Sequence, residues 1–207
     1  MPDTPYSNTA LVVIDVQNDF CPGGALAVEN GDQVVEPING MIRDFENVIL
    51  TQDWHPRDHS SFADNQVGKN LFETITLPYG EQTLWPSHCM QGSKGAAFHP
   101  ALDYNQAQLV IRKGFRTAID SYSAFFENDQ STATGLYGYL NERGITAVVL
   151  AGLATDFCVA FSALDAVKLG LATTVVLPAC RAIDLEGSLQ AQIDAMKKTG
   201  VVLQESL

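Results

Sequence analysis

The chain alternates between short apolar runs rich in β-branched residues and segments whose apolar residues recur every three or four positions. The first pattern is typical of strands buried on both faces, and the second of amphipathic helices. The predicted strands span residues 9–16, 48–53, 109–113, 146–153, 172–177 and 201–204, and the predicted helices span residues 33–45, 132–143, 157–169 and 188–199. This alternation predicts an α/β fold in which a parallel sheet carries helices on both faces.

One segment interrupts the alternation. Residues 62–100 are rich in Gly, Pro, Asn and other polar residues, and they are too many for an ordinary connection. Long irregular insertions in compact domains are commonly functional loops, so we expect this one to contribute to an active site. The whole chain of 207 residues fits one domain, and we expect a single domain over residues 1–207.

Composition narrows the class of protein. Charged residues make up only 17% of the chain, and the formal net charge is −12. That charge argues against nucleic acid or an anionic membrane as a partner, because both require a basic surface. The four cysteines form no C-x-x-C pair, and no apolar run approaches the length of a membrane span. We therefore expect a cytoplasmic protein with reduced thiols.

Polar side chains at the ends of the predicted strands suggest nucleophilic chemistry. In a parallel sheet these ends share one edge, where ligands bind. Asp15 comes from the first strand, Lys113 from the third, and Cys158 follows the fourth at the start of a helix. Asp15 could accept the thiol proton, while Lys113 and the helix N-terminus would favour a thiolate nucleophile. The alternatives are a buried structural cysteine, an aspartate that caps a turn and a surface lysine.

A second group of residues suggests a metal site. Asp53 and His55 are two positions apart, so in extended backbone they point to the same side. A carboxylate and an imidazole suit a divalent transition metal, which needs a third ligand from elsewhere. His88 on the insertion is the candidate; His59 is another, although a solvated loop histidine is the favoured interpretation. Cys89 could be a soft ligand, with a buried thiol as the favoured alternative.

Two aromatic residues are candidates for substrate binding. Phe20 lies just past the first strand, and Trp85 lies on the insertion. Either could belong to the core, but together near a nucleophile they could enclose a flat ring. No G-x-G-x-x-G follows the first strand and no G-x-x-x-x-G-K-[ST] is present, so a nucleotide site has no support.

Six motifs in order make the chain resemble the cysteine hydrolases of the isochorismatase-like superfamily and, within it, the bacterial nicotinamidases (pyrazinamidases). The resemblance covers nearly the whole chain. The motifs are Asp15-Val16-Gln17-Asn18-Asp19-Phe20-Cys21 followed by Gly23-Gly24, Gln52-Asp53-Trp54-His55-Pro56, Trp85-Pro86-Ser87-His88-Cys89, Lys113-Gly114, Asp120-Ser121-Tyr122-Ser123-Ala124-Phe125 and Gly152-Leu153-Ala154-Thr155-Asp156-Phe157-Cys158-Val159.

The resemblance implies a three-layer fold with a six-stranded, mainly parallel sheet. It implies hydrolysis of nicotinamide to nicotinate and ammonia through a thioester, with a side activity on pyrazinamide. The implied site residues are a catalytic triad of Asp15, Lys113 and Cys158, a zinc, iron or manganese ion on Asp53, His55 and His88, and a substrate ring between Phe20 and Trp85. The resemblance also implies a cis peptide before Ala154, with the Ala154 and Cys158 N–H groups aimed at one oxyanion. It leaves the oligomeric state open, a homo-oligomer included.

Two positions depart from the family pattern, and two alternative functions remain. His59 matches a fourth metal ligand of some relatives only if the loop is aligned with gaps. Phe157 stands where many relatives carry Tyr or His, which leaves the polarity of the pocket open. The isochorismatases proper lack both the nucleophilic cysteine and the metal set, so that branch is disfavoured. One alternative is an amidohydrolase for ureido or carbamoyl substrates, which needs no metal to bind a pyridine. The other is a non-catalytic binding module with Cys158 as a redox-sensitive thiol.

Overall fold

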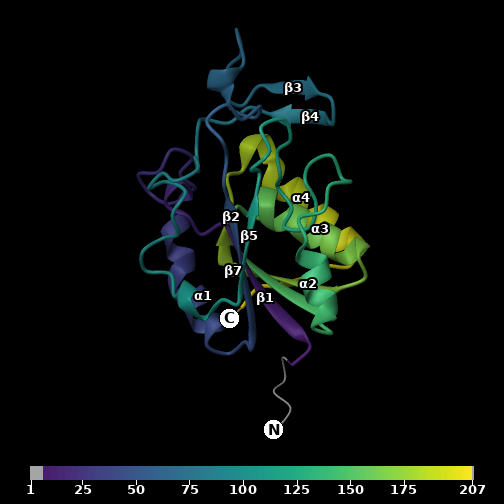
Figure 1. The fold of residues 1–207 in the computed structure, drawn as a ribbon. Coiled ribbons are helices and arrows are strands. Elements are labelled where there is room, and N and C mark those ends of the chain that lie inside the picture. The colour runs from purple at the N-terminus through teal and green to yellow at the C-terminus, as the bar shows by residue number, and fades with distance from the viewer. Residues whose placement is uncertain (1–6, 207) are drawn as a thin grey trace.

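The computed structural model describes residues 7–206, and its centre is a six-stranded parallel sheet in the order β5-β2-β1-β6-β7-β8 (Figure 1). The strands are β1 (Thr9–Ile14), β2 (Asn47–Asp53), β5 (Leu109–Lys113), β6 (Ala147–Leu153), β7 (Ala172–Arg181) and β8 (Val202–Gln204). The helices are α1 (Val35–Ile42), α2 (Leu136–Glu142), α3 (Ala160–Lys168) and α4 (Ser188–Thr199). The expected α/β fold with six parallel strands is confirmed.

The sheet is the middle of three layers. Helix α1 covers one face, and α2, α3 and α4 cover the other (Figure 1). Each face of the sheet has its own hydrophobic core, and β1 contributes side chains to both, because successive side chains of a strand point to opposite faces. Val12 and Ile14 pack beneath α2 and α3, while Leu11 and Val13 pack beneath α1. Within residues 7–206, no helix combines the length and the apolar character needed to cross a membrane.

The strand order reverses between β1 and β6. From β1 the chain continues outward to β2 and β5, and it then returns to β6 on the other side of β1 before reaching β7 and β8. Ligands of open α/β sheets bind in the crevice at such a reversal, beyond the carboxyl ends of the strands. The topology therefore places Asp15, which follows β1, and Cys158, which follows β6, at the position expected of a site.

Three helix starts differ from those expected. The first predicted helix divides into a 3-10 turn, Gly31–Val34, and α1. The second begins at Leu136 rather than residue 132, because Gly135 has a φ of 100° and cannot continue a helix. The third begins with a π-helical turn, Thr155–Val159, that carries Cys158 into α3. Such turns are frequent at functional sites.

The insertion contains an antiparallel hairpin that the hydrophobic pattern did not predict. Strands β3 (Thr74–Leu77) and β4 (Gly80–Thr83) pair beyond the end of the main sheet (Figure 1). Both strands are short and largely solvent-exposed, so neither shows a buried apolar run. The hairpin leads the chain to Trp85 and His88, and it thereby brings both residues over the carboxyl ends of the main sheet.

Candidate active site

Asp15, Lys113 and Cys158, from three separate elements, meet in the interior. The Lys113 Nζ lies 2.8 Å from Asp15 Oδ2 and 3.3 Å from the Cys158 Sγ, to which it donates a hydrogen bond. It also donates to the Asp53 carboxylate and, at 2.9 Å, to the backbone carbonyl of Ser121. Lys113 is fully buried, so its charge is balanced by these partners rather than by water.

Asp15 is held with one carboxylate oxygen open. It follows β1 with a φ of 47°, and its N–H donates to the Thr51 Oγ1 at 3.1 Å. The Thr51 hydroxyl donates in return to Asp15 Oδ1 at 2.6 Å. Oδ2 lies 2.8 Å from the Lys113 ammonium and has no aligned hydrogen-bond donor among the described residues, and the Cys158 thiol lies close to the same carboxylate. Oδ2 is therefore the oxygen available to take a proton from Cys158.

Charges inside the site shift the pKa values of its members in opposite directions. Burial alone would lower the pKa of Lys113, but Asp15 and Asp53 raise it well above its ordinary value. Burial alone would raise the pKa of Asp53, but Lys113 and His55 bring it well below its ordinary value. For Asp15 burial outweighs Lys113, and its pKa is raised. Lys113 and Asp53 thus form an ion pair beside a carboxylate with an increased affinity for protons.

The surroundings of Cys158 oppose the thiolate that Lys113 and the helix start would favour. Burial raises the pKa of Cys158 well above its ordinary value; Lys113 lowers it, but Asp15 and Asp53 raise it further. Desolvation and two nearby negative charges outweigh one ammonium and the start of a helix. These surroundings favour the thiol, so a neighbouring base would be needed to make Cys158 a nucleophile.

Asp53, His55 and His88 form a second cluster next to the first. The Nε2 atoms of His55 and His88 lie 3.5 and 3.8 Å from Asp53 Oδ2, and the three ligand atoms lie within 4.8 Å of one another. Each histidine donates its Nδ1–H to a backbone carbonyl at 2.8 Å, from Gly114 and Pro86 respectively. This leaves both Nε2 lone pairs available, the arrangement that is usual for metal-binding imidazoles in proteins. The residues therefore fit a divalent transition metal.

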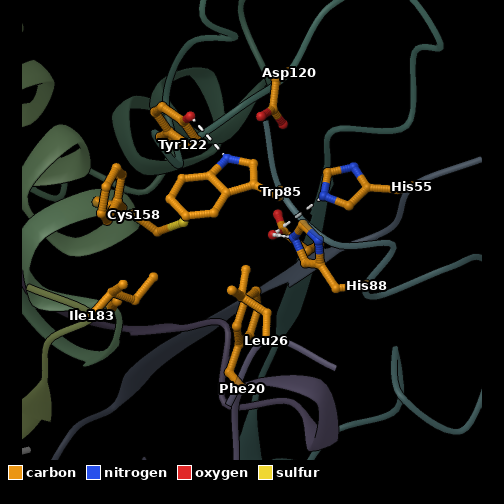
Figure 2. A pocket seen from close by; sticks show the side chains of 12 residues that line it. Phe20, Leu26, His55, Trp85, His88, Asp120, Tyr122, Cys158 and Ile183 are labelled. Atoms are coloured by element: carbon orange, nitrogen blue, oxygen red, sulfur yellow. Dashed lines mark hydrogen bonds and ion pairs between the residues drawn. The ribbon is translucent and has the colours of Figure 1, made fainter. Parts of the chain in front are cut away.

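A narrow pocket connects the two clusters (Figure 2). It is lined by Phe20, Leu26, Asp53, His55, Trp85, His88, Asp120, Tyr122, Ala154, Phe157, Cys158 and Ile183. The Trp85 ring meets Phe157 edge to face at 4.9 Å, and its Nε1–H donates to the Tyr122 hydroxyl at 3.0 Å. The Phe20 ring meets His88 edge to face at 5.5 Å. These contacts hold the side chains of Trp85 and Phe20 in place where they line the cavity.

Comparison with known proteins identifies the family of this chain. A family model described as the isochorismatase domain matches residues 9–206. The chain belongs to the isochorismatase family. A nicotinamidase of Acinetobacter baylyi is 57% identical over 195 residues, which cover 94% of this chain and 91% of that protein.

Solved structures of the isochorismatase family include proteins with the same fold over nearly their full length. A nicotinamidase/pyrazinamidase of Acinetobacter baumannii is 57% identical, with a TM-score of 0.96 and 97% of each chain covered. The structure of PnC1 from L. infantum in complex with nicotinate is 37% identical, with a TM-score of 0.85 and 99% and 96% covered. A Pyrococcus horikoshii pyrazinamidase in complex with zinc is 32% identical, with a TM-score of 0.77 and 96% and 99% covered.

His59 is not the solvated loop histidine that the sequence suggested for this member of the isochorismatase family. It is fully buried, and burial lowers its pKa to about 4. Its Nδ1 accepts from the Ser61 hydroxyl at 2.7 Å, and its Nε2 lies 3.3 Å from the Ile119 carbonyl. With Asp120 and His55 it forms a second group of closely spaced ligand atoms. Both His59 nitrogens already have protein partners, which favours Asp53 and His88 as the companions of His55.

The expected cis peptide between Leu153 and Ala154 is present. The aim of the Ala154 and Cys158 N–H groups at an oxyanion remains a prediction. Cys89 is a buried thiol, as expected. The pattern of apolar residues gave no role to Leu26, Tyr122 or Ile183, although Tyr122 lies in one of the quoted motifs.

Gly114 packs directly against the ring of His55, which makes it a test of the metal site. A Cβ at Gly114 would lie 2.3 Å from His55 Cε1, and the φ of 61° disfavours a side chain. Gly114→Ala is expected to displace the imidazole and weaken zinc affinity by about 10- to 100-fold, as for other changes that disturb ligand orientation. Competition with a chromophoric chelator measures the affinity. Gly138→Ala is the control, because no atom lies within 4 Å of its added methyl; equal affinities in the two variants would contradict the assignment.

Proposed function

We propose that the chain hydrolyses nicotinamide to nicotinate and ammonia, with pyrazinamide as a second substrate. One observation carries the proposal: the Cys158 thiol lies 3.3 Å from the Lys113 ammonium, which in turn lies 2.8 Å from Asp15, beside a pocket that contains Asp53, His55 and His88. A thiol, a base and an adjacent cation suit acyl transfer to cysteine. The relative from A. baylyi is a nicotinamidase, in keeping with this proposal.

The first half of the reaction forms a thioester. Asp15 takes the Cys158 proton, and the sulfur attacks the amide carbon while the C=O electrons move to oxygen. The tetrahedral intermediate then collapses, and the C–N bond breaks as the proton on Asp15 passes to the departing nitrogen, which leaves as ammonia. Lys113 remains charged throughout because two carboxylates raise its pKa, so it can balance the negative charge carried by the thiolate or by Asp15.

The second half restores the enzyme. Asp15, again a carboxylate, takes a proton from water, and the resulting hydroxide attacks the thioester carbonyl. The C–S bond breaks, and the proton on Asp15 passes to the sulfur. The product leaves as nicotinic acid, which loses its remaining proton to water and becomes nicotinate. The raised pKa of Asp15 suits this alternation, because a carboxyl group with a higher pKa is a better proton acceptor in each half.

In this proposal the pyridine ring lies between Phe20 and Trp85, with its nitrogen toward Asp53, His55 and His88. These three residues would hold zinc, iron or manganese, and a bound ion would orient and polarise the ring. The zinc complex of the P. horikoshii pyrazinamidase supports zinc as the first ion to test.

Removal of the metal is expected to lower ammonia release from nicotinamide by at least about tenfold, because the ring loses one of its orienting contacts. Dialysis against a chelator followed by a coupled ammonia assay measures the loss, and elemental analysis should show one ion per chain before dialysis. Zinc, iron or manganese added back should restore the rate. His88→Ala should behave like the metal-free protein, whereas His99→Ala, outside the pocket lining, serves as the control. Unchanged kinetics in the metal-free protein would show that the ion has no part in the reaction.

A substrate panel separates the proposal from its alternatives. Nicotinamide, pyrazinamide and a ureido amide are assayed for ammonia release with and without added zinc. Zinc-dependent turnover of the two ring amides is expected. Metal-independent turnover of the ureido amide alone would favour the carbamoyl hydrolase. The absence of any turnover, together with an alkylation rate at Cys158 typical of an unperturbed thiol, would favour a binding module.

A further inference from the structure

Asp156 is a buried acidic residue that the proposed reaction does not use. It lies two positions before Cys158, in the same π-helical turn, and only 1% of it is exposed. None of the ion pairs found within residues 7–206 includes it. A buried carboxylate must nevertheless be satisfied by hydrogen bonds, so its donors indicate what it holds in place.

All hydrogen bonds to the Asp156 carboxylate come from one segment, which connects β7 to α4 and includes the first residue of α4. The Ile183 N–H donates to Oδ1 at 3.0 Å, and the Asp184 N–H donates to Oδ2 at 2.8 Å. The Ser188 hydroxyl also donates to Oδ2. We call residues 183–188 the strap. Asp156 thus binds both ends of the strap to the turn that carries the nucleophile.

The strap has a backbone that needs such support. Asp184 and Glu186 have φ values of 53° and 52°, and Gly187 has a φ of 86°. Left-handed conformations are uncommon for residues other than glycine, and they persist where surrounding contacts impose them. The hydrogen bond that the Asp184 N–H donates to the charged Asp156 carboxylate is the contact that fixes the first of these residues.

The strap carries one side chain into the pocket, that of Ile183. Figure 2 shows Ile183 on the same side of the cavity as Cys158, with His55 and His88 on the opposite side. In the proposed pose the ring nitrogen faces the two histidines. Ile183 then lies on the side of the ring away from that nitrogen, where carbons 4 and 5 follow carbon 3, which carries the amide.

We propose that Ile183 determines substrate specificity by excluding substituents on these ring carbons, and that Asp156 is a positioning residue that holds Ile183 there. The substrate class is therefore pyridine and pyrazine carboxamides that are unsubstituted opposite the metal-facing nitrogen. This inference rests on the proposed nicotinamidase activity, since it uses the same pose.

The test compares kcat/KM for nicotinamide, 5-methylnicotinamide and 6-methylnicotinamide. Ile183→Ala is expected to raise the ratio of 5-methylnicotinamide to nicotinamide by about tenfold or more, the usual effect of space for one extra carbon in an apolar pocket. The ratio for 6-methylnicotinamide should not rise, because that methyl group lies beside the ring nitrogen, away from Ile183. An equal gain for both methyl compounds would mean general loosening of the pocket, and it would overturn the role of Ile183.

Asp156→Asn tests the positioning role with nearly the same shape. Its amide nitrogen cannot accept from the strap, so the strap should loosen and the 5-methylnicotinamide ratio should rise as in Ile183→Ala. Ser188→Ala removes one donor and keeps the carboxylate, so it should give a smaller rise and serves as a second variant if Asp156→Asn does not fold. A purely structural role would lower kcat/KM for both substrates equally and leave the ratio unchanged.

The outcomes separate this inference from the proposed function. A wild-type protein that releases no ammonia from nicotinamide contradicts the proposed function itself. The inference about the strap alone is overturned if the wild type is active on nicotinamide but the variants do not change specificity. In that case the folded Ile183→Ala and Ser188→Ala variants would have the wild-type ratio of kcat/KM for 5-methylnicotinamide to that for nicotinamide.

Discussion

Cys158→Ser is expected to abolish ammonia release from nicotinamide, with a loss in kcat of at least about four orders of magnitude. The Cys158 sulfur is the only nucleophile that the site places against both Lys113 and the open oxygen of Asp15 among the described residues. A serine hydroxyl has a far higher pKa than a thiol, so a carboxylate base cannot activate it to the same degree. The residual rate should resemble that of Cys158→Ala.

The control for this loss is a second buried cysteine. Cys21 is 4% exposed but does not line the pocket. Because the substitution changes a group outside the site, a folded Cys21→Ser protein should keep a rate within about threefold of the wild type. Thermal unfolding of each variant establishes that the fold is retained. Rapid quenching of the wild-type reaction should also show a nicotinoyl group on the peptide that contains Cys158. Near-normal turnover by a folded Cys158→Ser protein would contradict the thioester mechanism.

The features predicted correctly from the sequence are those that depend on neighbouring residues in the chain or on the general geometry of a parallel sheet. Strand β5 and helix α4 have the bounds expected. Strand β5, Leu109–Lys113, lies between Gln108 and Gly114, and α4 ends at Thr199, just before Gly200, which has a φ of 90°. The convergence of Asp15, Lys113 and Cys158 was also predictable. Parallel strands deliver their carboxyl ends to one edge, so three strand-end residues needed no detailed coordinates to be placed together.

The features that the sequence did not predict depend on contacts between segments that are far apart in the sequence. His59 lies in a polar stretch and was expected in solvent, but Ser61 and Ile119 enclose it. A helix start and a lysine favour a thiolate at Cys158, but burial and the carboxylates of Asp15 and Asp53 shift its pKa upward, and these contacts come from distant parts of the chain. The strap is held by Asp156 across 27 to 32 residues of sequence, a distance at which no local pattern signals the contact.

Asp15→Asn is expected to separate two properties of Cys158 that are usually linked. Ammonia release should fall by about three orders of magnitude or more, because asparagine can neither take the thiol proton nor deliver one to the leaving nitrogen. The reactivity of the thiol toward iodoacetamide should nevertheless increase. Burial and the negative charge of Asp15 both raise the pKa of Cys158, and the substitution removes that charge while Lys113 remains.

The two measurements are made on the same preparation. The pH dependence of alkylation at Cys158 should give a lower thiol pKa in Asp15→Asn than in the wild type, and the ammonia assay should show the loss of turnover. The Thr51→Val variant is the matched control, since it removes the hydroxyl that donates to Asp15 Oδ1 but keeps the carboxylate. It should lose far less activity than Asp15→Asn. A raised thiol pKa in Asp15→Asn would mean that Asp15 stabilises a resting thiolate, whereas retained turnover would mean that another group is the base.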